Sequence, residues 1–335
     1  MKNIELIRAL PKPETHLHLE GALPWHFLNQ KDPHRFAKEP FFRNNSFRYD
    51  SFSHFESILI EHALEIFKSA EDYYHVASSI FKNLKSQNVR YVETSFHAGM
   101  IEFLRIPGKE ILEAISSASP DELEVRIFMG ISRNAYTDYL SSELDQAIEN
   151  WENLAGIDLH GPEELPLESW TIPFWEKAKK NDRILKAHAG EFGPSSNIDQ
   201  AITKLGVRRV QHGVAARDSE ATLNLIKENN VCLDMCPISN YKLKVINTWS
   251  EHPLKFFIEE GICCTLSTDD PFSFNNTLEE EYLNCLEKLN MEPTDLIKLA
   301  KNGFEVADLN LDKKKDLFVE INKLVQEIDE GRFSE

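Results

Sequence analysis

The sequence predicts an α/β fold, a single (β/α)8 barrel (TIM barrel) with an aromatic-rich helical insertion after the first strand. Two observations predict it. Eight short segments rich in β-branched and apolar residues recur along the chain, and segments with helical periodicity separate them. Strands that alternate with helices form parallel βαβ units, and eight such units can close into a barrel. A doubly wound open sheet is the competing fold, but the chain has no GxGxxG or GxxxxGK turn to favour it.

The expected elements follow from these two patterns. We expect the strands at Thr15–Leu19, Val89–Ser95, Glu124–Gly130, Gly156–Leu159, Ile184–Ala187, Arg209–Gln211, Val231–Met235 and Cys263–Ser267. Helical periodicity predicts helices that include Ala70–Ser86, Ser219–Asn229, Pro253–Glu260 and Thr277–Leu289.

The domain organisation follows from length and composition. A chain of 335 residues that is 41% hydrophobic can bury a large core, and α/β barrels commonly reach this size as one domain. We therefore expect one barrel domain over residues 1–335, with a lid-like insertion at 24–69. This insertion is rich in aromatic residues, among them Trp25, Phe27, Phe36, Phe41, Phe42, Phe47, Phe52 and Phe55. It could cover the barrel mouth above an apolar ligand, or it could pack against the barrel as an accessory layer.

Composition narrows the classes of partner. The net charge of −18 repels phosphate backbones, which disfavours nucleic acid as a partner. The five cysteines are an odd number, and most lie in or beside apolar runs, which indicates reduced thiols rather than a disulfide framework. Neither a signal peptide nor an apolar run of membrane-spanning length is evident. We expect a soluble, cytoplasmic protein without a membrane partner.

Ionisable residues fall where the predicted strands end. His16 and His18 lie on the first strand, Asp158 ends the fourth, and His188 ends the fifth. His212 follows the sixth strand and Asp269 the eighth. Because barrel enzymes form their active sites at the C-terminal ends of the strands, these groups are expected to meet at one mouth.

Four of these residues predict a metal site. His16 and His18 are two positions apart on a strand, so their side chains point the same way. Together with His188 and Asp269 they offer the mixed nitrogen and oxygen ligands that Zn²⁺ accepts, with room left for a water molecule. A zinc ion in such a shell makes water a nucleophile near neutral pH. The sequence therefore predicts one zinc ion and a hydrolytic enzyme.

Further residues near these ligands are candidates for the chemistry. Glu191 follows His188 by three positions across Gly190, and we expect it to shuttle a proton. His212 is expected to orient the attacking water or stabilise charge rather than bind metal. Pro271 restricts Asp270 to extended geometry, so Asp269 can bind the metal while Asp270 contacts water or substrate.

A glycine and an aspartate at the end of the fourth strand complete the set. Gly161 would allow a ligand to approach the backbone closely, so that its N–H can donate to a ring nitrogen. Asp158 is expected to brace that turn.

These motifs together resemble those of a known family. The chain is similar to the adenosine/adenine deaminase branch of the amidohydrolase superfamily over nearly its whole length. The motifs that carry the resemblance are His-x-His-Leu-Glu-Gly (16–21), Asp-Leu-x-Gly (158–161), His-Ala-Gly-Glu (188–191), Gln-His-Gly (211–213), Cys-Pro-Ile-Ser-Asn (236–240) and Ser-Thr-Asp-Asp-Pro (267–271).

The resemblance implies a role for each site residue. It implies a (β/α)8 barrel with one zinc held by His16, His18, His188 and Asp269. It further implies that Glu191 protonates the purine ring nitrogen beside the amino-bearing carbon, and that His212 and Asp270 position and deprotonate the attacking water. The residues expected to contact the substrate are Gly161, Asp270, Glu20 and His18.

The implied reaction is the zinc-dependent deamination of a small 6-aminopurine. Adenosine, converted to inosine and ammonia, is the simplest nucleoside substrate, with adenine or another 6-aminopurine as the alternative. Members that act on adenosine often have aspartate at the position of Glu20, and this glutamate lies closer to the adenine-deaminase pattern. Thr94-Ser95-Phe96-His97, at the end of the second strand, lacks the sequence pattern associated with adenine deaminases.

Two other functions remain as alternatives. A barrel metallohydrolase that cleaves an ester, amide or phosphoester would need two metals bridged by a carboxylated lysine, for which Lys186 is poorly placed. A non-enzymatic barrel would have lost a ligand or the proton shuttle, and every position is filled here.

Overall fold

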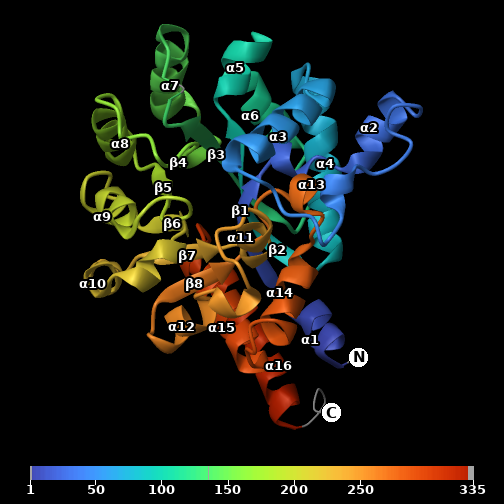
Figure 1. The fold of residues 1–335 in the computed structure, drawn as a ribbon, viewed down its shortest axis with the longest axis vertical. Helices are drawn as coiled ribbons and strands as arrows, with labels where there is room; N and C mark the ends of the chain where they lie inside the picture. Colours follow the sequence, from blue (N-terminus) through green and yellow to red (C-terminus); the bar gives the residue numbers. More distant parts are fainter. Residues whose placement is uncertain (1, 135, 331–335) are drawn as a thin grey trace.

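Eight parallel strands form the barrel at the centre of the molecule (Figure 1). The computed structural model describes residues 2–134 and 136–330. Neighbouring strands pair in sequence order, and their bounds are β1 (Lys12–His18), β2 (Val89–His97), β3 (Glu124–Ser132), β4 (Leu154–His160), β5 (Ile184–Ala189), β6 (Arg209–His212), β7 (Cys232–Met235) and β8 (Cys263–Leu266).

The ring closes between β1 and the segment after β8. Leu17 and Asp269 form a parallel bridge. The His18 N–H donates to the Asp269 carbonyl and the Asp269 N–H donates to the His16 carbonyl, each at 3.0 Å. The predicted (β/α)8 barrel is thus confirmed. β8 stops at Leu266, one residue before the expected end at Ser267, and Asp269 stands in the loop that follows it.

Helices surround the barrel and cover its outer face (Figure 1). Their bounds are α1 (Lys2–Ala9), α2 (Trp25–Lys31), α3 (Phe52–Ile66), α4 (Ala70–Ser86), α5 (Gly99–Leu104), α6 (Gly108–Ser117), α7 (Asp138–Asn150), α8 (Thr171–Lys180), α9 (Ser195–Thr203), α10 (Glu220–Glu228), α11 (Pro237–Lys242), α12 (Leu254–Glu259), α13 (Pro271–Phe274), α14 (Leu278–Glu287), α15 (Pro293–Val306) and α16 (Leu311–Asp329). None of the helices in the described ranges has the length and apolar character that a bilayer crossing demands.

Helix ends follow local capping chemistry. Helix α4 begins where Ser69 Oγ accepts the Asp72 N–H at 3.2 Å. Helix α14 begins with a capping box in which Thr277 and Glu280 each accept the other's backbone N–H. Such side-chain acceptors satisfy amide groups that have no partner within the helix. The expected helix at Ala70–Ser86 is confirmed with the same bounds.

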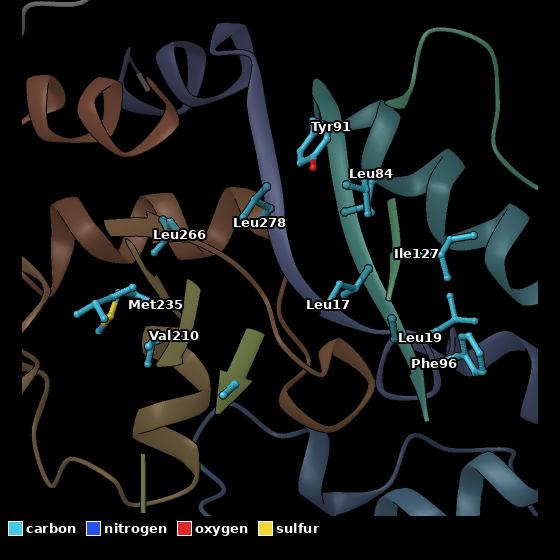
Figure 2. Close-up of a cluster of buried hydrophobic side chains, with 14 of the residues drawn as sticks. Leu17, Leu19, Leu84, Tyr91, Phe96, Ile127, Val210, Met235, Leu266 and Leu278 are labelled. Atoms are coloured by element: carbon cyan, nitrogen blue, oxygen red, sulfur yellow. The ribbon is translucent and has the colours of Figure 1, made fainter. Parts of the chain in front are cut away.

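Apolar side chains fill the space between the strands and the helices (Figure 2). At the end of β1 and in the residue after it, Leu17 and Leu19 alternate with His16 and His18. The leucines are 2% and 0% exposed. Alternation along the strand therefore directs the apolar residues to the surrounding core and leaves the histidines on the interior side of the barrel.

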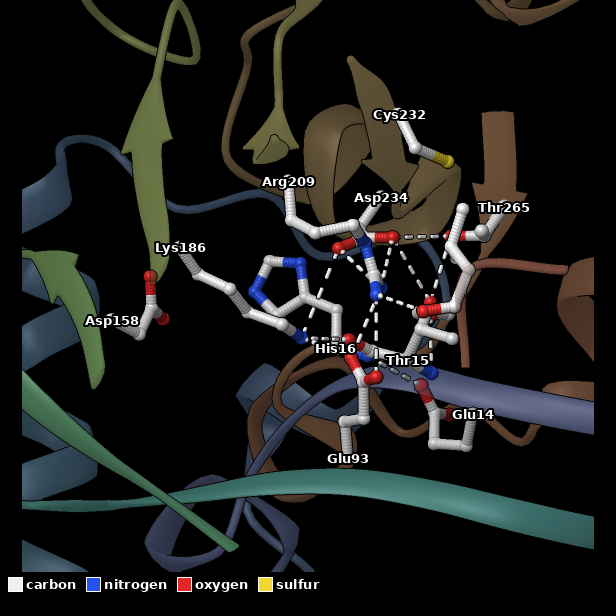
Figure 3. Close-up of polar contacts among 12 residues, drawn as sticks. Glu14, Thr15, His16, Glu93, Asp158, Lys186, Arg209, Cys232, Asp234 and Thr265 are labelled. Atoms are coloured by element: carbon white, nitrogen blue, oxygen red, sulfur yellow. Dashed lines mark hydrogen bonds and ion pairs between the residues drawn. The ribbon is translucent and has the colours of Figure 1, made fainter. Parts of the chain in front are cut away.

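The barrel interior below the mouth holds a buried ionic layer, defined here as Glu93, Lys186, Arg209 and Asp234 (Figure 3). Arg209 Nη2 lies 3.0 Å from Glu93 Oε2 and 2.8 Å from Asp234 Oδ1, and Lys186 Nζ pairs with Glu93. Two cations and two anions are thus paired out of contact with water. Lys186 is engaged in this layer.

The insertion at 24–69 divides into two parts. In the first, Trp25, Phe36 and Phe42 pack together with Phe272 of α13, with ring centroids 5.6–6.4 Å apart. The second part is α3, whose apolar face lines the cavity at the barrel mouth. The first part therefore packs as an accessory layer, whereas α3 stands over the mouth.

Candidate metal and active site

Four side chains direct their ligand atoms at one centre in the barrel mouth: His16 and His18 from β1, His188 from β5, and Asp269 after β8. The three Nε2 atoms lie 3.1–3.3 Å from one another. Asp269 Oδ1 lies 3.3 Å from the Nε2 atoms of His16 and His18. Ligands at 2.0–2.1 Å in a tetrahedral zinc shell are spaced by about 3.3–3.4 Å. The donor set and its spacing fit one such ion.

The contacts of His188 Nδ1 show that Nε2 is the ring nitrogen free to bind a metal ion. His188 Nδ1 lies 3.2 Å from the Leu159 carbonyl oxygen and 3.3 Å from Asp158 Oδ2. Both are acceptors, so Nδ1 carries the proton and the lone pair of Nε2 faces the common centre. Asp158 lies within β4, which continues to His160, and its contact is with His188 rather than with the turn at Gly161.

The other two histidines are held in a similar way. His18 Nδ1 lies 3.0 Å from Ser95 Oγ, and His16 Nδ1 lies 3.4 Å from Cys236 Sγ. Contacts to the outer nitrogen fix the ring orientation, so the inner nitrogens stay directed at the centre.

Backbone conformation lets both adjacent aspartates face the mouth. Neighbouring side chains on a regular strand point in opposite directions. Asp269 instead has a left-handed φ of +66°, which breaks the alternation after β8. Ser239 Oγ donates to Asp269 Oδ2 at 2.7 Å. Although burial acts in the opposite direction, nearby His16 holds the pKa of Asp269 well below its usual range.

Asp270 presents an oxygen without a protein partner. Its Oδ1 is buried and has no hydrogen-bond partner among the described residues, and the side chain lines the cavity. Burial, followed by the neighbouring Asp269, raises the pKa of Asp270 well above its usual range. A Cβ atom at Gly21 would lie 1.6 Å from this oxygen. Glycine at that position therefore makes room for the Asp270 carboxyl group.

Glu163 holds the turn that carries Glu191. Its carboxylate accepts the backbone N–H groups of Glu191, Phe192 and Gly193 at 2.8–2.9 Å, and also that of Gly190. Several N–H donors on one carboxylate fix both the turn and the charge. The Glu191 side chain is thereby placed on a rigid support.

Glu191 and His212 face one another beside the metal centre. His212 Nε2 lies 3.5 Å from Glu191 Oε2 and 3.8 Å from Asp269 Oδ2. His212 has a left-handed φ of +64°, which is uncommon for a non-glycine residue. Burial, with Asp269 and Glu163 nearby, raises the pKa of Glu191 well above its usual range. A raised pKa favours the protonated carboxyl group, the form that can act as a general acid.

Glu20 is fixed at the edge of the cavity. Tyr73 Oη donates to Glu20 Oε1 at 2.8 Å, and the His97 N–H lies 3.2 Å from the same oxygen. Burial raises the pKa of Glu20. The carboxyl group therefore has a set position between α4 and the end of β2.

A cavity of about 130 Å³ joins these groups. Glu191, His212, Asp270 and Gly161 line it, and Gly161 has a positive φ of +88° that favours glycine at this position. The opposite wall is the apolar face of α3, formed by Phe52, Phe55, Leu59, Ile60, Ala63 and Leu64. An apolar slot with a few convergent polar groups suits a flat heterocycle.

The structure brings all the predicted site residues to this mouth. His16 lies in the ligand cluster, and the others line the cavity: His18, Glu20, Gly161, His188, Glu191, His212, Asp269 and Asp270.

Supporting residues were not predicted. Glu163, Ser95, Cys236 and Ser239 hold the site residues, as described above. Cys236 and Ser239 belong to the 236–240 motif, and Ser95 pairs with His18 in the register of β1 and β2. The 236–240 motif could have indicated Cys236 and Ser239, and the register of β1 and β2 could have indicated Ser95.

Comparison with known proteins places the chain in a family. The sequence model of the adenosine deaminase family matches residues 11–324. The adenine deaminase of Crocosphaera subtropica is 29% identical over 324 residues, which cover 94% of this chain and 99% of that protein.

Solved structures share the fold. The adenine deaminase of Arthrobacter aurescens superposes with a TM-score of 0.84 at 21% identity, covering 95% of this chain and 99% of that chain. An amidohydrolase of Burkholderia ambifaria with bound Zn has a TM-score of 0.82 at 23% identity, covering 96% of this chain and 93% of that chain. The family match extends over most of the chain and over every motif of the site. The chain therefore belongs to the adenosine deaminase family of the amidohydrolase superfamily, and it is a hydrolytic deaminase that acts on purines.

Proposed function

We propose that this protein hydrolyses the exocyclic amino group at C6 of an uncharged 6-aminopurine. The observation that carries the proposal is the convergence of a zinc-type ligand cluster, Glu191, His212 and Asp270 on one apolar slot. Each reaction component that a deamination needs has a candidate in this slot: a metal site, a proton donor, a proton acceptor and a flat apolar wall.

A zinc ion held by His16, His18, His188 and Asp269 would supply the Lewis acidity that lowers the pKa of water. Two residues beside this site, Asp270 and Glu191, carry out separate proton transfers. Asp270, with its unpartnered Oδ1, accepts the proton of the attacking water, because a cation held by the neighbouring Asp269 would lower the pKa of this carboxyl group and favour its ionised form. Glu191 donates a proton to the ring nitrogen beside C6.

The bond changes then balance. Water oxygen bonds to C6 as the ring nitrogen takes the proton of Glu191. The C6–N bond breaks as the amino group takes the proton that Asp270 received and leaves as ammonia, and the remaining hydroxyl proton at C6 returns to Glu191 as the carbonyl forms. His212 orients these groups, and the Gly161 N–H donates to the purine. The product carries a carbonyl at C6.

Adenine is favoured over adenosine as the substrate. The sequence placed adenosine first, but the Crocosphaera subtropica relative is named adenine deaminase. Glu20 supports the free base, because Tyr73 and the His97 N–H hold its carboxyl group at the cavity edge where a sugar would have to fit. Adenosine is the second candidate.

A nucleotide is disfavoured by charge. The cavity walls include Glu20, Glu56, Glu163, Glu191 and Asp270, whereas no lysine or arginine is among the described residues that line it. A phosphate group would therefore meet several carboxyl groups and no cationic side chain to pair with it.

The test is ammonia release by zinc-loaded protein from adenine, adenosine, deoxyadenosine and AMP. We expect turnover of adenine above that of either nucleoside, and none of AMP. Glu191→Gln is expected to keep its zinc and lose turnover, because the amide has no proton to donate in this way. Absence of ammonia from all four compounds would refute the proposal.

A further inference from the structure

A hydrogen-bonded chain of buried residues leads from the start of α12 to His212. The Leu254 N–H donates to His252 Nδ1 at 3.2 Å. Because Nδ1 accepts, the neutral His252 ring carries its proton on Nε2. His252 is 6% exposed, so no bulk water competes for these positions.

His252 in turn orients the side-chain amide of Asn240. His252 Nε2 lies 3.2 Å from Asn240 Oδ1, and Asn240 is fully buried. Nε2 is a donor, so it requires the carbonyl oxygen and not the NH₂ group of the amide opposite it. The reverse orientation of the amide would set two donors against one another.

The Asn240 amide then points its NH₂ group at the catalytic centre. Asn240 Nδ2 lies 3.1 Å from His212 Nδ1 and 3.5 Å from Glu191 Oε1. An NH₂ group only donates, so His212 Nδ1 accepts and the ring proton resides on Nε2. The Nε2–H faces Glu191 Oε2 and Asp269 Oδ2, which are acceptors. The opposite tautomer would have a donor against a donor on one side and a lone pair against two carboxyl groups on the other.

We propose that His252 and Asn240 are positioning residues that fix the tautomer of His212, so that His212 presents an N–H donor to the reacting atoms. The inference rests on the proposed deaminase function for the meaning of that donor, and on the hydrogen bonds alone for the tautomer. A neutral His212 with its proton on Nε2 cannot take the proton of the attacking water at that atom. His212 therefore stabilises and orients as a donor, and Asp270 is left as the proton acceptor.

Asn240→Asp is the sharpest test, because it changes the donor to an acceptor with almost no change of shape. The new carboxylate would face His212 Nδ1 and draw the ring proton to that atom. We expect kcat to fall by about 100-fold, the scale of a misplaced acid–base group, with zinc content kept and KM little changed. Asn302→Asp is the matched control, because the Asn302 side-chain NH₂ group likewise acts as a donor, to the Cys264 carbonyl oxygen, away from the site. It is expected to leave kcat unchanged.

Two substitutions at His252 test whether the site needs a hydrogen-bond donor at the position of Nε2. A glutamine amide nitrogen can reach the place of Nε2 and still donate to Asn240, whereas an asparagine replaces only Nδ1. His252→Gln is therefore expected to retain about tenfold more of the wild-type kcat than His252→Asn, roughly the value of one hydrogen bond.

A spectroscopic measurement reads the tautomer without substrate. In ¹⁵N-histidine-labelled, zinc-loaded protein, the His212 signals can be assigned by their loss in His212→Gln. We expect a proton on Nε2 in the wild type and on Nδ1 in Asn240→Asp. A wild-type proton on Nδ1, or an Asn240→Asp variant with unchanged tautomer and kcat, would overturn the inference. A wild type with the expected tautomer but no ammonia release would instead count against the proposed function alone.

Discussion

Glu163 Oε2 accepts the backbone N–H of Glu191 at 2.9 Å, so the Glu163 carboxylate supports the chain segment that carries the Glu191 side chain. Glu163→Ala removes this support and leaves several N–H groups of the turn without a partner. We expect kcat to fall by about 10- to 100-fold while zinc is retained, because His188 lies before the turn on β5. Metal analysis and steady-state kinetics measure both effects. The exposed neighbour Glu164 provides the control, and equal kcat in Glu163→Ala and Glu164→Ala would show that the support is not needed.

Removal of a ligand should remove the metal. His188→Ala takes away one of four donors around the common centre, and we expect zinc affinity to fall at least about tenfold. Chelation of wild-type protein is expected to lower the melting temperature, because a bound ion stabilises only the folded chain. Zinc stoichiometry by elemental analysis is the measurement. His75→Ala on the exposed face of α4 is the control, and an unchanged zinc content in His188→Ala would exclude His188 as a ligand.

A methyl group at position 21 should disable Asp270. A Cβ at Gly21 would lie 1.6 Å from Asp270 Oδ1, so Gly21→Ala must displace that carboxyl group. We expect turnover to be nearly lost and stability to fall by about 1–3 kcal/mol. Gly261 is a useful contrast, because it has a φ of +77° and nothing within 4 Å of its Cβ position. Gly261→Ala is expected to cost about 1–2 kcal/mol from backbone strain and to leave kcat as it is. Kinetics and denaturant unfolding of both variants distinguish the two effects.

The folded protein should lose stability in acid partly through His252. Burial, reinforced by Arg217, lowers the pKa of His252 to about 3 from its usual 6.5. The unfolded chain therefore binds more protons between these values, so this contribution to stability is complete above pH 6.5 and is lost as the pH falls toward 3. The loss from this one group is about 1.4 kcal/mol per pH unit.

His252→Gln removes the titrating ring, so its free energy of unfolding should fall less steeply below pH 6.5 than that of the wild type. Denaturant unfolding at several pH values measures the two slopes. Parallel slopes for the two proteins would contradict the assignment of a low pKa to His252.

The sequence predicted the barrel and the site because both depend on local patterns. The alternation of His16 and His18 with Leu17 and Leu19 already divides β1 into an interior and a core-facing side. Motif residues at the strand ends meet because a parallel barrel brings those ends to one mouth.

What the sequence did not show depends on side-chain packing between distant segments. Asp158 was expected at a turn, but β4 continues to His160 and places its carboxylate beside His188. The contacts from His252 through Asn240 to His212 join the segment before α12, helix α11 and the end of β6. No spacing rule connects those positions, and the direction of each hydrogen bond depends on the neighbour before it.

The four residues of the buried ionic layer carry two positive and two negative charges, which cancel (Figure 3). The floor of the barrel consequently contributes little electric potential to the reacting purine. Under the proposed function, discrimination between neutral and anionic compounds then falls to the carboxyl groups that line the cavity, and a lining residue outside the catalytic set, such as Glu56, can be exchanged without disturbing the catalytic groups or the layer beneath them.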